Sequence, residues 1–168
     1  VQLIATAQRP LVTPLVNGEF RLLDISDQKQ VDQVIRNTKP EVIINTAAMT
    51  NVDRCETERE ACWQANVTAV QYLVEACGNH KIHLIHVSTD FIFDGKEGPL
   101  DESAVPDPVN YYGESKLAAE ELIRKSSISW CILRTVLVYG VSTDMSRSNI
   151  VLWVKKSLEE GKTLNVVN

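Results

Sequence analysis

The sequence predicts an α/β fold in which a doubly wound parallel sheet is covered by helices. Short apolar runs rich in β-branched residues alternate with segments of helical periodicity, which is the pattern of strand–helix–strand units. The chain has 168 residues, a suitable length for one domain, and its 44% apolar content is enough for a buried core. The elements expected in chain order are strand 1–7, strand 20–23, helix 27–38, strand 41–46, helix 58–77, strand 82–87, helix 111–125, strand 130–136, helix 149–160 and strand 163–167.

Local signals set the bounds of the elements in the first half. Ser26 is a plausible N-cap for helix 27–38, and Pro40 explains why that helix closes where it does. The continuous apolar run Val42-Ile43-Ile44 predicts a strand buried on both faces. Helix 58–77 is expected from apolar residues that recur at helical spacing, namely Ala61, Ala65, Ala69, Leu73 and Ala76.

The second half places a long loop between two elements. The polar segment 90–109 follows strand 82–87, contains three prolines and two glycines, and fits a mobile active-site segment. Helix 111–125 is rich in alanine at its centre, and strand 130–136 follows it. The segment 149–160 has helical character, and 163–167 is read as the start of another strand.

The phosphate-binding turn that usually opens a nucleotide-binding sheet is missing from this sequence. Such sheets begin with a strand, a Gly-rich turn and a helix whose N-terminus takes a pyrophosphate. The chain has seven glycines, and none forms G-x-x-G-x-x-G or G-x-G-x-x-G. We therefore expect residues 1–168 to be the interior of a longer protein, truncated at both ends. The absent first strand would lie between strands 1–7 and 41–46, and a substrate region would start at about 145–168.

Composition excludes several functional classes. A net charge of −5 and a pI near 5.2 argue against a nucleic-acid surface, and no apolar run approaches the length of a membrane span. The four cysteines form no C-x-x-C pair, so we expect reduced, partly buried thiols and a cytoplasmic protein. His83 and His86 fall on opposite faces of their strand, which disfavours a metal site.

The strongest chemical signal is Tyr112 followed four residues later by Lys116. On a helix these two side chains lie on one face, one turn apart. An ammonium there favours the phenolate, lowers the pKa of the tyrosine and allows it to exchange a proton near neutral pH. A hydroxyl at the end of the preceding strand, in Ser88-Thr89-Asp90, can bond the same carbonyl oxygen. The chemistry predicted is proton transfer to or from an alcohol or ketone during hydride transfer.

With these motifs in place, the chain resembles the extended short-chain dehydrogenase/reductases, and within them the dTDP-4-dehydrorhamnose reductase branch. The resemblance covers nearly all residues and implies a partial NAD(P)-binding domain of the Rossmann-like class. The matching blocks occur in the family's order, at 23–27 (LDISD), 40–53 (PEVIINTAAMTNVD), 88–95 (STDFIFDG), 110–120 (NYYGESKLAAE) and 133–140 (LRTVLVYG).

This resemblance implies catalytic roles for four residues. Thr89 would bind the substrate carbonyl, Tyr112 would act as the general acid, and Lys116 would bind the cofactor ribose and tune Tyr112. Asn66 would hold a water that links the lysine to solvent, although a structural amide bridging two helices is the alternative. The substrate is expected at Thr89, Asp90 and Phe91.

The same resemblance implies a cofactor site built from the ends of several strands. An Arg suits the 2′-phosphate of NADP, and Arg9 after the first strand, with no acid before Glu19, favours NADP(H) over NAD(H). The residues expected to bind the cofactor are Arg9, Asp24, Ile25, Asn45, Ala47, Ala48, Thr50, Tyr112, Lys116, Val136, Leu137 and Val138.

Two departures from the family's pattern bear on the substrate. The reductase branch commonly carries Trp where this chain has Leu137, which weakens the case for a dTDP-sugar. Thr89-Asp90-Phe91 also lacks the extra carboxylate of the sugar-nucleotide dehydratases, so dehydration is disfavoured.

Three functions are compatible with the sequence. The first is NADP(H)-dependent reduction of a nucleotide-sugar ketone. The second is a non-catalytic binding module, because the regulatory subunit of methionine adenosyltransferase resembles the same branch. The third is a nucleotide-sugar epimerase that retains its cofactor. The oligomeric state stays open, with a homodimer as one option, and we expect the 168-residue piece alone to be inactive.

Overall fold

The computed structural model describes residues 1–11, 15–138, 140 and 150–164. Its strands are β1 (Ile4–Ala7), β2 (Glu19–Leu22), β3 (Val42–Asn45), β4 (His83–Thr89) and β5 (Trp130–Thr135). Its helices are α1 (Gln28–Thr38), α2 (Val52–Thr57), α3 (Arg59–Trp63), α4 (Ala69–His80), α5 (Tyr111–Lys125) and α6 (Ile150–Glu159). A π-helical turn, η1 (Gln64–Thr68), and a 3₁₀ turn, η2 (Asp90–Ile92), complete the elements.

All strand pairs in the described part of the chain are parallel. β1 pairs with β2, and β3, β4 and β5 form a second sheet in that order. The register puts Asn45 beside His86 and Thr89 beside Thr135, so the carboxyl ends of β3, β4 and β5 share one edge. This arrangement confirms the predicted fold class.

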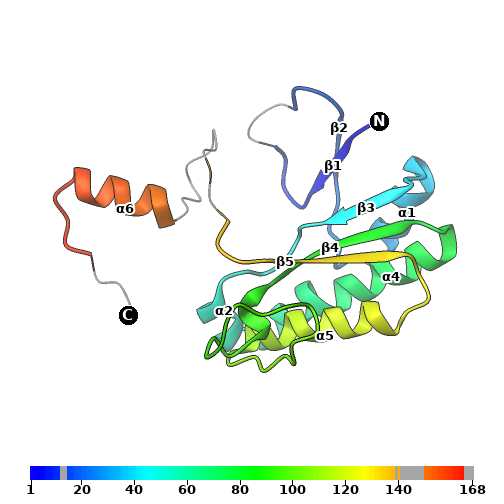
Figure 1. Ribbon diagram of the computed structural model, residues 1–168. Helices are drawn as coiled ribbons and strands as arrows, with labels where there is room; N and C mark the ends of the chain where they lie inside the picture. The colour runs from blue at the N-terminus through cyan, green and yellow to red at the C-terminus, as the bar shows by residue number, and fades with distance from the viewer. Residues whose placement is uncertain (12–14, 139, 141–149, 165–168) are drawn as a thin grey trace.

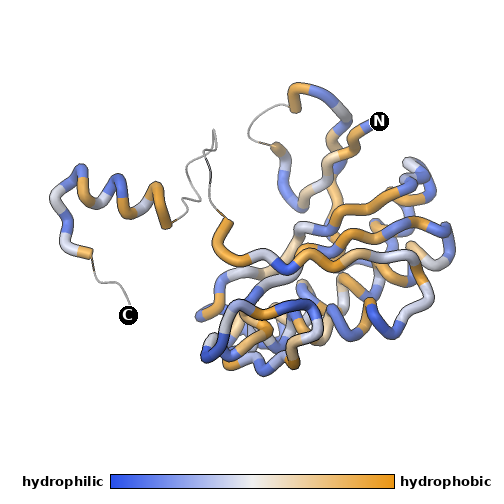
Figure 2. Tube along the Cα trace, in the orientation of Figure 1, coloured by the Kyte–Doolittle hydropathy of each residue, from blue (hydrophilic) through white to orange (hydrophobic). Residues whose placement is uncertain are grey.

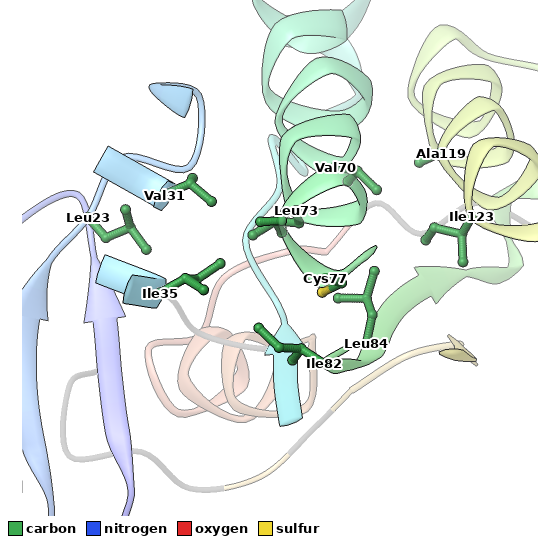
Figure 3. Packing of buried hydrophobic residues seen from close by; sticks show 11 residues of the cluster. Leu23, Val31, Ile35, Val70, Leu73, Cys77, Ile82, Leu84, Ala119 and Ile123 are labelled. Carbon is green, nitrogen blue, oxygen red and sulfur yellow. The ribbon is translucent and has the colours of Figure 1, made fainter. Parts of the chain in front are cut away.

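The core lies between the second sheet and the helices α1, α4 and α5, which cover one of its faces (Figure 1). Figure 3 shows how Leu73 of α4, Leu84 of β4 and Ile123 of α5 converge there. Leu84 and Ile123 are fully buried. The residues of this cluster are Leu23, Val31, Ile35, Val70, Leu73, Ala76, Cys77, Ile82, Leu84, Ala119 and Ile123.

The prediction that β3 is buried on both faces is wrong for this structure. Val42 and Ile44 are 47% and 64% exposed, whereas Ile43, which points to the helical side, packs against the core. The cause is that α1, α4 and α5 lie on one face of the sheet only. Figure 2 shows that these strands are hydrophobic along much of their length.

Two helix boundaries also differ from the sequence expectation. Asp27, not Ser26, caps α1, because its carboxylate accepts from the backbone N–H groups of Lys29 and Gln30. The expected helix 58–77 is interrupted by η1 and continues to His80. A short helix that periodicity did not predict, α2, precedes it, with Asn51 as its N-cap.

The C-terminal part departs from expectation in one element. α6 forms close to the predicted bounds and stands apart from the sheet in Figure 1. Thr163 and Leu164 are not in a strand, and the rest of the predicted strand 163–167 lies outside the described residues.

The cysteines, the two histidines of β4 and the described helices complete the comparison between sequence and structure. All four cysteines are free thiols, as predicted, and three of them are buried. His83 is half-buried and shares a hydrogen bond with Ser129, whereas His86 is fully buried, so the two rings lie on opposite faces. Among the described helices, none has the length and apolar character needed to cross a bilayer.

Candidate active site

A cleft of about 370 Å³ opens at the carboxyl ends of β3, β4 and β5. In an open parallel sheet this edge is where ligands bind. Nine of the residues predicted for catalysis, cofactor or substrate line it, together with five others. The full lining is Thr46, Ala48, Thr50, Val52, Val87, Ser88, Thr89, Asp90, Phe91, Tyr112, Lys116, Thr135, Val136 and Leu137.

Tyr112 is fixed by the first turn of α5. The side chain of Asn110 caps this helix by accepting from the N–H of Gly113 at 2.8 Å. The phenol ring is 8% exposed and meets Phe91 edge-on, with ring centroids 5.7 Å apart. A Cβ on Gly113 would overlap the carbonyl oxygen of Phe91, so only glycine lets α5 approach the turn after β4 this closely.

Thr89 ends β4 and is positioned by the turn that follows it. Its hydroxyl accepts from the backbone N–H of Phe91 at 3.2 Å and donates to the carboxylate of Asp90 at 3.1 Å. The backbone of Thr89 is extended, and its side chain is 6% exposed on the wall of the cleft. The structure therefore brings Thr89 and Tyr112 into one cleft from separate elements.

Burial raises the pKa of Tyr112, and a hydrogen bond with Thr89 lowers it in part. This direction is opposite to the one expected from the Tyr–Lys spacing. Burial is the largest influence, and Lys116 is not among the groups that shift the pKa of Tyr112. Nζ of Lys116 instead donates to the carbonyl of Val87 at 2.8 Å and lies 3.2 Å from Nε2 of His86.

Lys116 is itself an unusual lysine. It is 2% exposed, and burial lowers its pKa to about 8, with the charge of Glu120 acting in the opposite direction. An amine with a pKa in this range exchanges its proton close to neutral pH. The catalytic role of Lys116 stays a prediction, and the lowered pKa of its amine comes from burial.

Asn66 is buried in η1 and fully engaged with protein groups. Its amide pairs with both the N–H and the C=O of Met49, at 2.8 and 3.1 Å, and donates to Ser115 Oγ at 2.9 Å. Ser115 in turn donates to the carbonyl of Tyr112 at 2.7 Å. These contacts are those of the structural bridge considered above, and the water-relay role of Asn66 stays a prediction.

An ion pair ties α5 to the sheet below the cleft. Glu120 is fully buried, and Arg134 of β5 binds it with its Nε and Nη2 atoms, the shortest contact being 2.8 Å. The Arg134 guanidinium also lies 5.2 Å from the centroid of Phe93. Arg124 adds a contact of 3.2 Å from the solvent side. This pair fixes the helix that carries Tyr112.

Seven of the predicted site residues do not line the cleft. Arg9, Asp24 and Ile25 follow the strands of the other sheet, β1–β2, where Arg9 is exposed and Asp24 accepts from Ser26. The other four are Asn45, Ala47, Asn66 and Val138. The cofactor roles of six of these residues and the catalytic role of Asn66 stay predictions.

Sequence reasoning missed two residues next to the cleft. His86 was considered only as a metal ligand, yet it contacts Lys116 beneath the cleft. Ser88, which lines the cleft, stands in the sequence only within a matching block, yet among the described residues its Oγ is the one buried side-chain N or O atom without a hydrogen-bond partner. The period of two along β4 is the signal that could have found them, because it puts His86 and Ser88 on the same face as Leu84 of the core.

The cleft fits the kind of cofactor that the sequence implies. Ser88 offers an unpaired hydroxyl, Lys116 a buried amine, and Val136 and Leu137 an apolar surface that is 72% and 57% exposed. A ribose supplies hydroxyls for the polar groups, and a nicotinamide ring suits the apolar ones.

Comparison with known proteins identifies the family. Residues 2–168 match the RmlD substrate binding domain. The chain is 42% identical to the dTDP-4-dehydrorhamnose reductase of Aggregatibacter actinomycetemcomitans over 73% of its length. It is 31% identical to methionine adenosyltransferase 2 subunit beta of Xenopus laevis over 88% of its length. The matches cover 42% and 44% of those proteins.

A solved structure gives the same result. The Bacillus anthracis dTDP-4-dehydrorhamnose reductase in complex with NADP superposes with a TM-score of 0.77 at 30% identity, over 86% of this chain and 52% of that one. The chain therefore spans about half the length of the proteins it matches. It belongs to the RmlD substrate-binding-domain family, in the dTDP-4-dehydrorhamnose reductase branch of the extended short-chain dehydrogenase/reductases.

Proposed function

We propose that the whole protein is an NADP(H)-dependent reductase of a nucleotide-sugar ketone. The observation that carries the proposal is the convergence of Thr89, Tyr112 and Lys116 on one cleft at the carboxyl edge of the sheet. A module that only binds a partner has no evident need for all three groups. The reductases among the relatives, one of them solved with NADP, support the same reading.

Each residue has a distinct task in the proposed reaction. NADPH, when bound, supplies the hydride that the keto carbon accepts. Thr89 donates a hydrogen bond to the keto oxygen, and Tyr112 gives its phenolic proton to that oxygen as the alkoxide forms. With its raised pKa Tyr112 holds its proton at neutral pH, which is the protonation state that a general acid requires. Lys116 lies one turn along the helix, and in this proposal its amine holds the ribose.

The preference for NADP(H) rests on separate support. Arg9 is exposed just after β1, and no acid occurs in the sequence between it and Glu19. A guanidinium favours the 2′-phosphate, whereas a carboxylate favours the free ribose hydroxyls. The test is to measure the NADPH and NADH affinities of the whole protein and of Arg9→Gln. We expect the ratio of NADPH affinity to NADH affinity to be smaller in the variant.

The experiment that tests the reductase assignment compares Tyr112→Phe with Tyr111→Phe in the whole protein. Tyr111 is the neighbouring phenol, packed against Trp63 and Arg59 outside the cleft. With dTDP-4-dehydrorhamnose as substrate and NADPH absorbance as the readout, Tyr112→Phe should lose roughly 10²–10⁴-fold in kcat. NADPH affinity should stay nearly unchanged, and Tyr111→Phe should turn over normally. Near-normal turnover by Tyr112→Phe would remove the assignment.

A second candidate is a non-catalytic subunit, which the likeness to methionine adenosyltransferase 2 subunit beta favours. A protein of this kind would bind NADPH but oxidise none of it with any 4-keto nucleotide sugar. An epimerase would differ again, by keeping its nicotinamide bound through dilution and gel filtration.

A further inference from the structure

A chain of three buried polar residues lies beneath the cleft, and two of them, Asn45 and His86, have no task in the reaction proposed above. It runs from Asn45 at the end of β3, through His86 of β4, to Lys116 of α5. Nδ2 of Asn45 lies 3.2 Å from Nδ1 of His86, and Nε2 of His86 lies 3.2 Å from Nζ of Lys116. The three residues are 5%, 0% and 2% exposed. Buried polar groups of this kind are costly unless their donors and acceptors match.

The donors and acceptors can be assigned by starting from a fixed group. The backbone N–H of Ala47 only donates, and it lies 3.1 Å from the Asn45 side chain, so the atom facing it is the oxygen. The amide nitrogen of Asn45 therefore faces His86. Because that nitrogen only donates, Nδ1 of His86 must accept. A neutral imidazole that accepts at Nδ1 carries its proton on Nε2.

This tautomer directs an N–H toward Lys116. A neutral amine can accept that bond through its lone pair while it donates to the carbonyl of Val87 at 2.8 Å. An ammonium has three donors and no acceptor, so Nε2 of His86 would have to give up its proton. The proton would then lie on Nδ1, facing the donor atom of Asn45, and one buried hydrogen bond would be lost. The network thus matches the uncharged lysine.

We propose that His86, oriented by Asn45, is the positioning residue that sets the direction and the proton affinity of the Lys116 amine. Its tautomer changes when Lys116 gains or loses a proton. This role deepens the proposed reductase function and rests on it, because it matters for turnover only if Lys116 works beside Tyr112. The network itself exists whether or not the protein reduces a sugar.

The charges around the network agree with this assignment. Burial and the charge of Lys116 lower the pKa of His86 to about 3, so the ring stays neutral at physiological pH. Burial lowers the pKa of Lys116 to about 8. The charged group that opposes this is Glu120, one turn further along α5, while Tyr112 lies one turn before. His86 is the titratable neighbour that β4 contributes.

The direct test is nitrogen NMR of the His86 ring in the whole protein without cofactor, with the signal assigned by its loss in His86→Gln. We expect a neutral ring with its proton on Nε2 above pH 9. As the pH falls through the pKa of Lys116, the proton should move toward Nδ1 without the ring becoming charged. A ring that titrates near pH 6.5, that carries its proton on Nδ1 above pH 9, or whose tautomer ignores the titration of Lys116 would overturn the proposal.

Two variants test the coupling from opposite directions. In Asn45→Asp, both carboxylate oxygens accept, so the proton of His86 should move to Nδ1 and the pKa of Lys116 should rise by at least about one unit. His86→Gln can keep the native pattern, with its oxygen toward Asn45 and its N–H toward Lys116. We expect the pKa of Lys116, read from its Cε chemical shift, to stay within about half a unit there.

Failure of this proposal is distinguishable from failure of the proposed function. An Asn45→Asp protein with unchanged His86 tautomer and Lys116 pKa would refute the positioning role even if the protein reduces sugars normally. A protein without reductase activity whose His86 and Lys116 titrate together would refute only the function. Where activity is present, the alkaline limb of the pH–kcat profile should move with the pKa of Lys116 in Asn45→Asp and stay in place in His86→Gln.

Discussion

Replacing Arg134 with methionine is expected to lower the free energy of unfolding more than removing an exposed surface charge does. Glu120 is fully buried, and Arg134, whose side chain is 15% exposed, supplies the shortest of its hydrogen bonds, at 2.8 Å. Arg134→Met keeps most of the side-chain volume but leaves the carboxylate with Arg124 alone. The Arg124 side chain is 44% exposed, so water weakens its attraction.

The size of the loss in free energy of unfolding follows from the burial of the Glu120 carboxylate, which loses its main partner. Breaking a buried ion pair by removing one partner costs about 3–5 kcal/mol. Because Arg124 keeps one contact of 3.2 Å with Glu120, we expect the lower end of that range, about 3 kcal/mol in the free energy of unfolding. Loss of the guanidinium over Phe93 contributes a further part of roughly 0.5–1 kcal/mol.

Urea denaturation of the whole protein, followed by circular dichroism, measures this cost. Arg124→Ala should lose less than about 1 kcal/mol because it removes a half-exposed partner, and Lys125→Ala, whose pair with Glu121 is exposed on both sides, should lose close to nothing. Combining Arg134→Met with Glu120→Leu removes both charges and should recover most of the stability. A loss under about 1 kcal/mol for Arg134→Met, or a double variant less stable than the single one, would refute the reasoning.

Three further predictions concern the residues that shape the cleft. Gly113→Ala should destabilise the protein by about 2 kcal/mol despite the better helix propensity of alanine, because the new methyl group meets the carbonyl of Phe91; Gly113→Ser should do the same in thermal melts. Asn66→Ala should cost about 2–3 kcal/mol in urea denaturation, since the N–H and C=O of Met49 both lose their partner; a cost below 1 kcal/mol would contradict the bridging role. Lys116 keeps its proton to about pH 10.5 when unfolded and to about 8 when folded, so the unfolded state binds more protons in that window and stability should rise with pH there, by about 3 kcal/mol. Lys116→Met should abolish that rise, and a variant with an unchanged pH dependence would show that another group is responsible.

The sequence predicted the elements whose signals are local. The bounds of α5 agree with expectation because a capping asparagine, Asn110, precedes it and its periodicity is unbroken. It also predicted that Thr89, Tyr112 and Lys116 belong together, since the ends of neighbouring parallel strands and the following helix meet at one edge of a sheet. In contrast, no local pattern in the sequence predicts the π-helical turn η1. The contact made by Asn66 of this turn is with the backbone of Met49, 17 positions earlier, and local patterns do not record contacts at that separation.

What the sequence by itself determined is therefore the fold class, the family and the chemical identity of the candidate site residues. Only the tertiary structure decided how those groups behave. The Tyr112–Lys116 spacing implies a lowered pKa for the tyrosine, yet in the folded protein burial raises the pKa of Tyr112, and the Lys116 amine contacts His86. Likewise, Val42-Ile43-Ile44 is apolar throughout, but helices cover one face of the sheet and leave Val42 and Ile44 exposed. The physical reason is the same in both cases: pKa and burial depend on distances between residues 30 or more positions apart, as in the 3.2 Å between His86 and Lys116, and no periodicity records those distances.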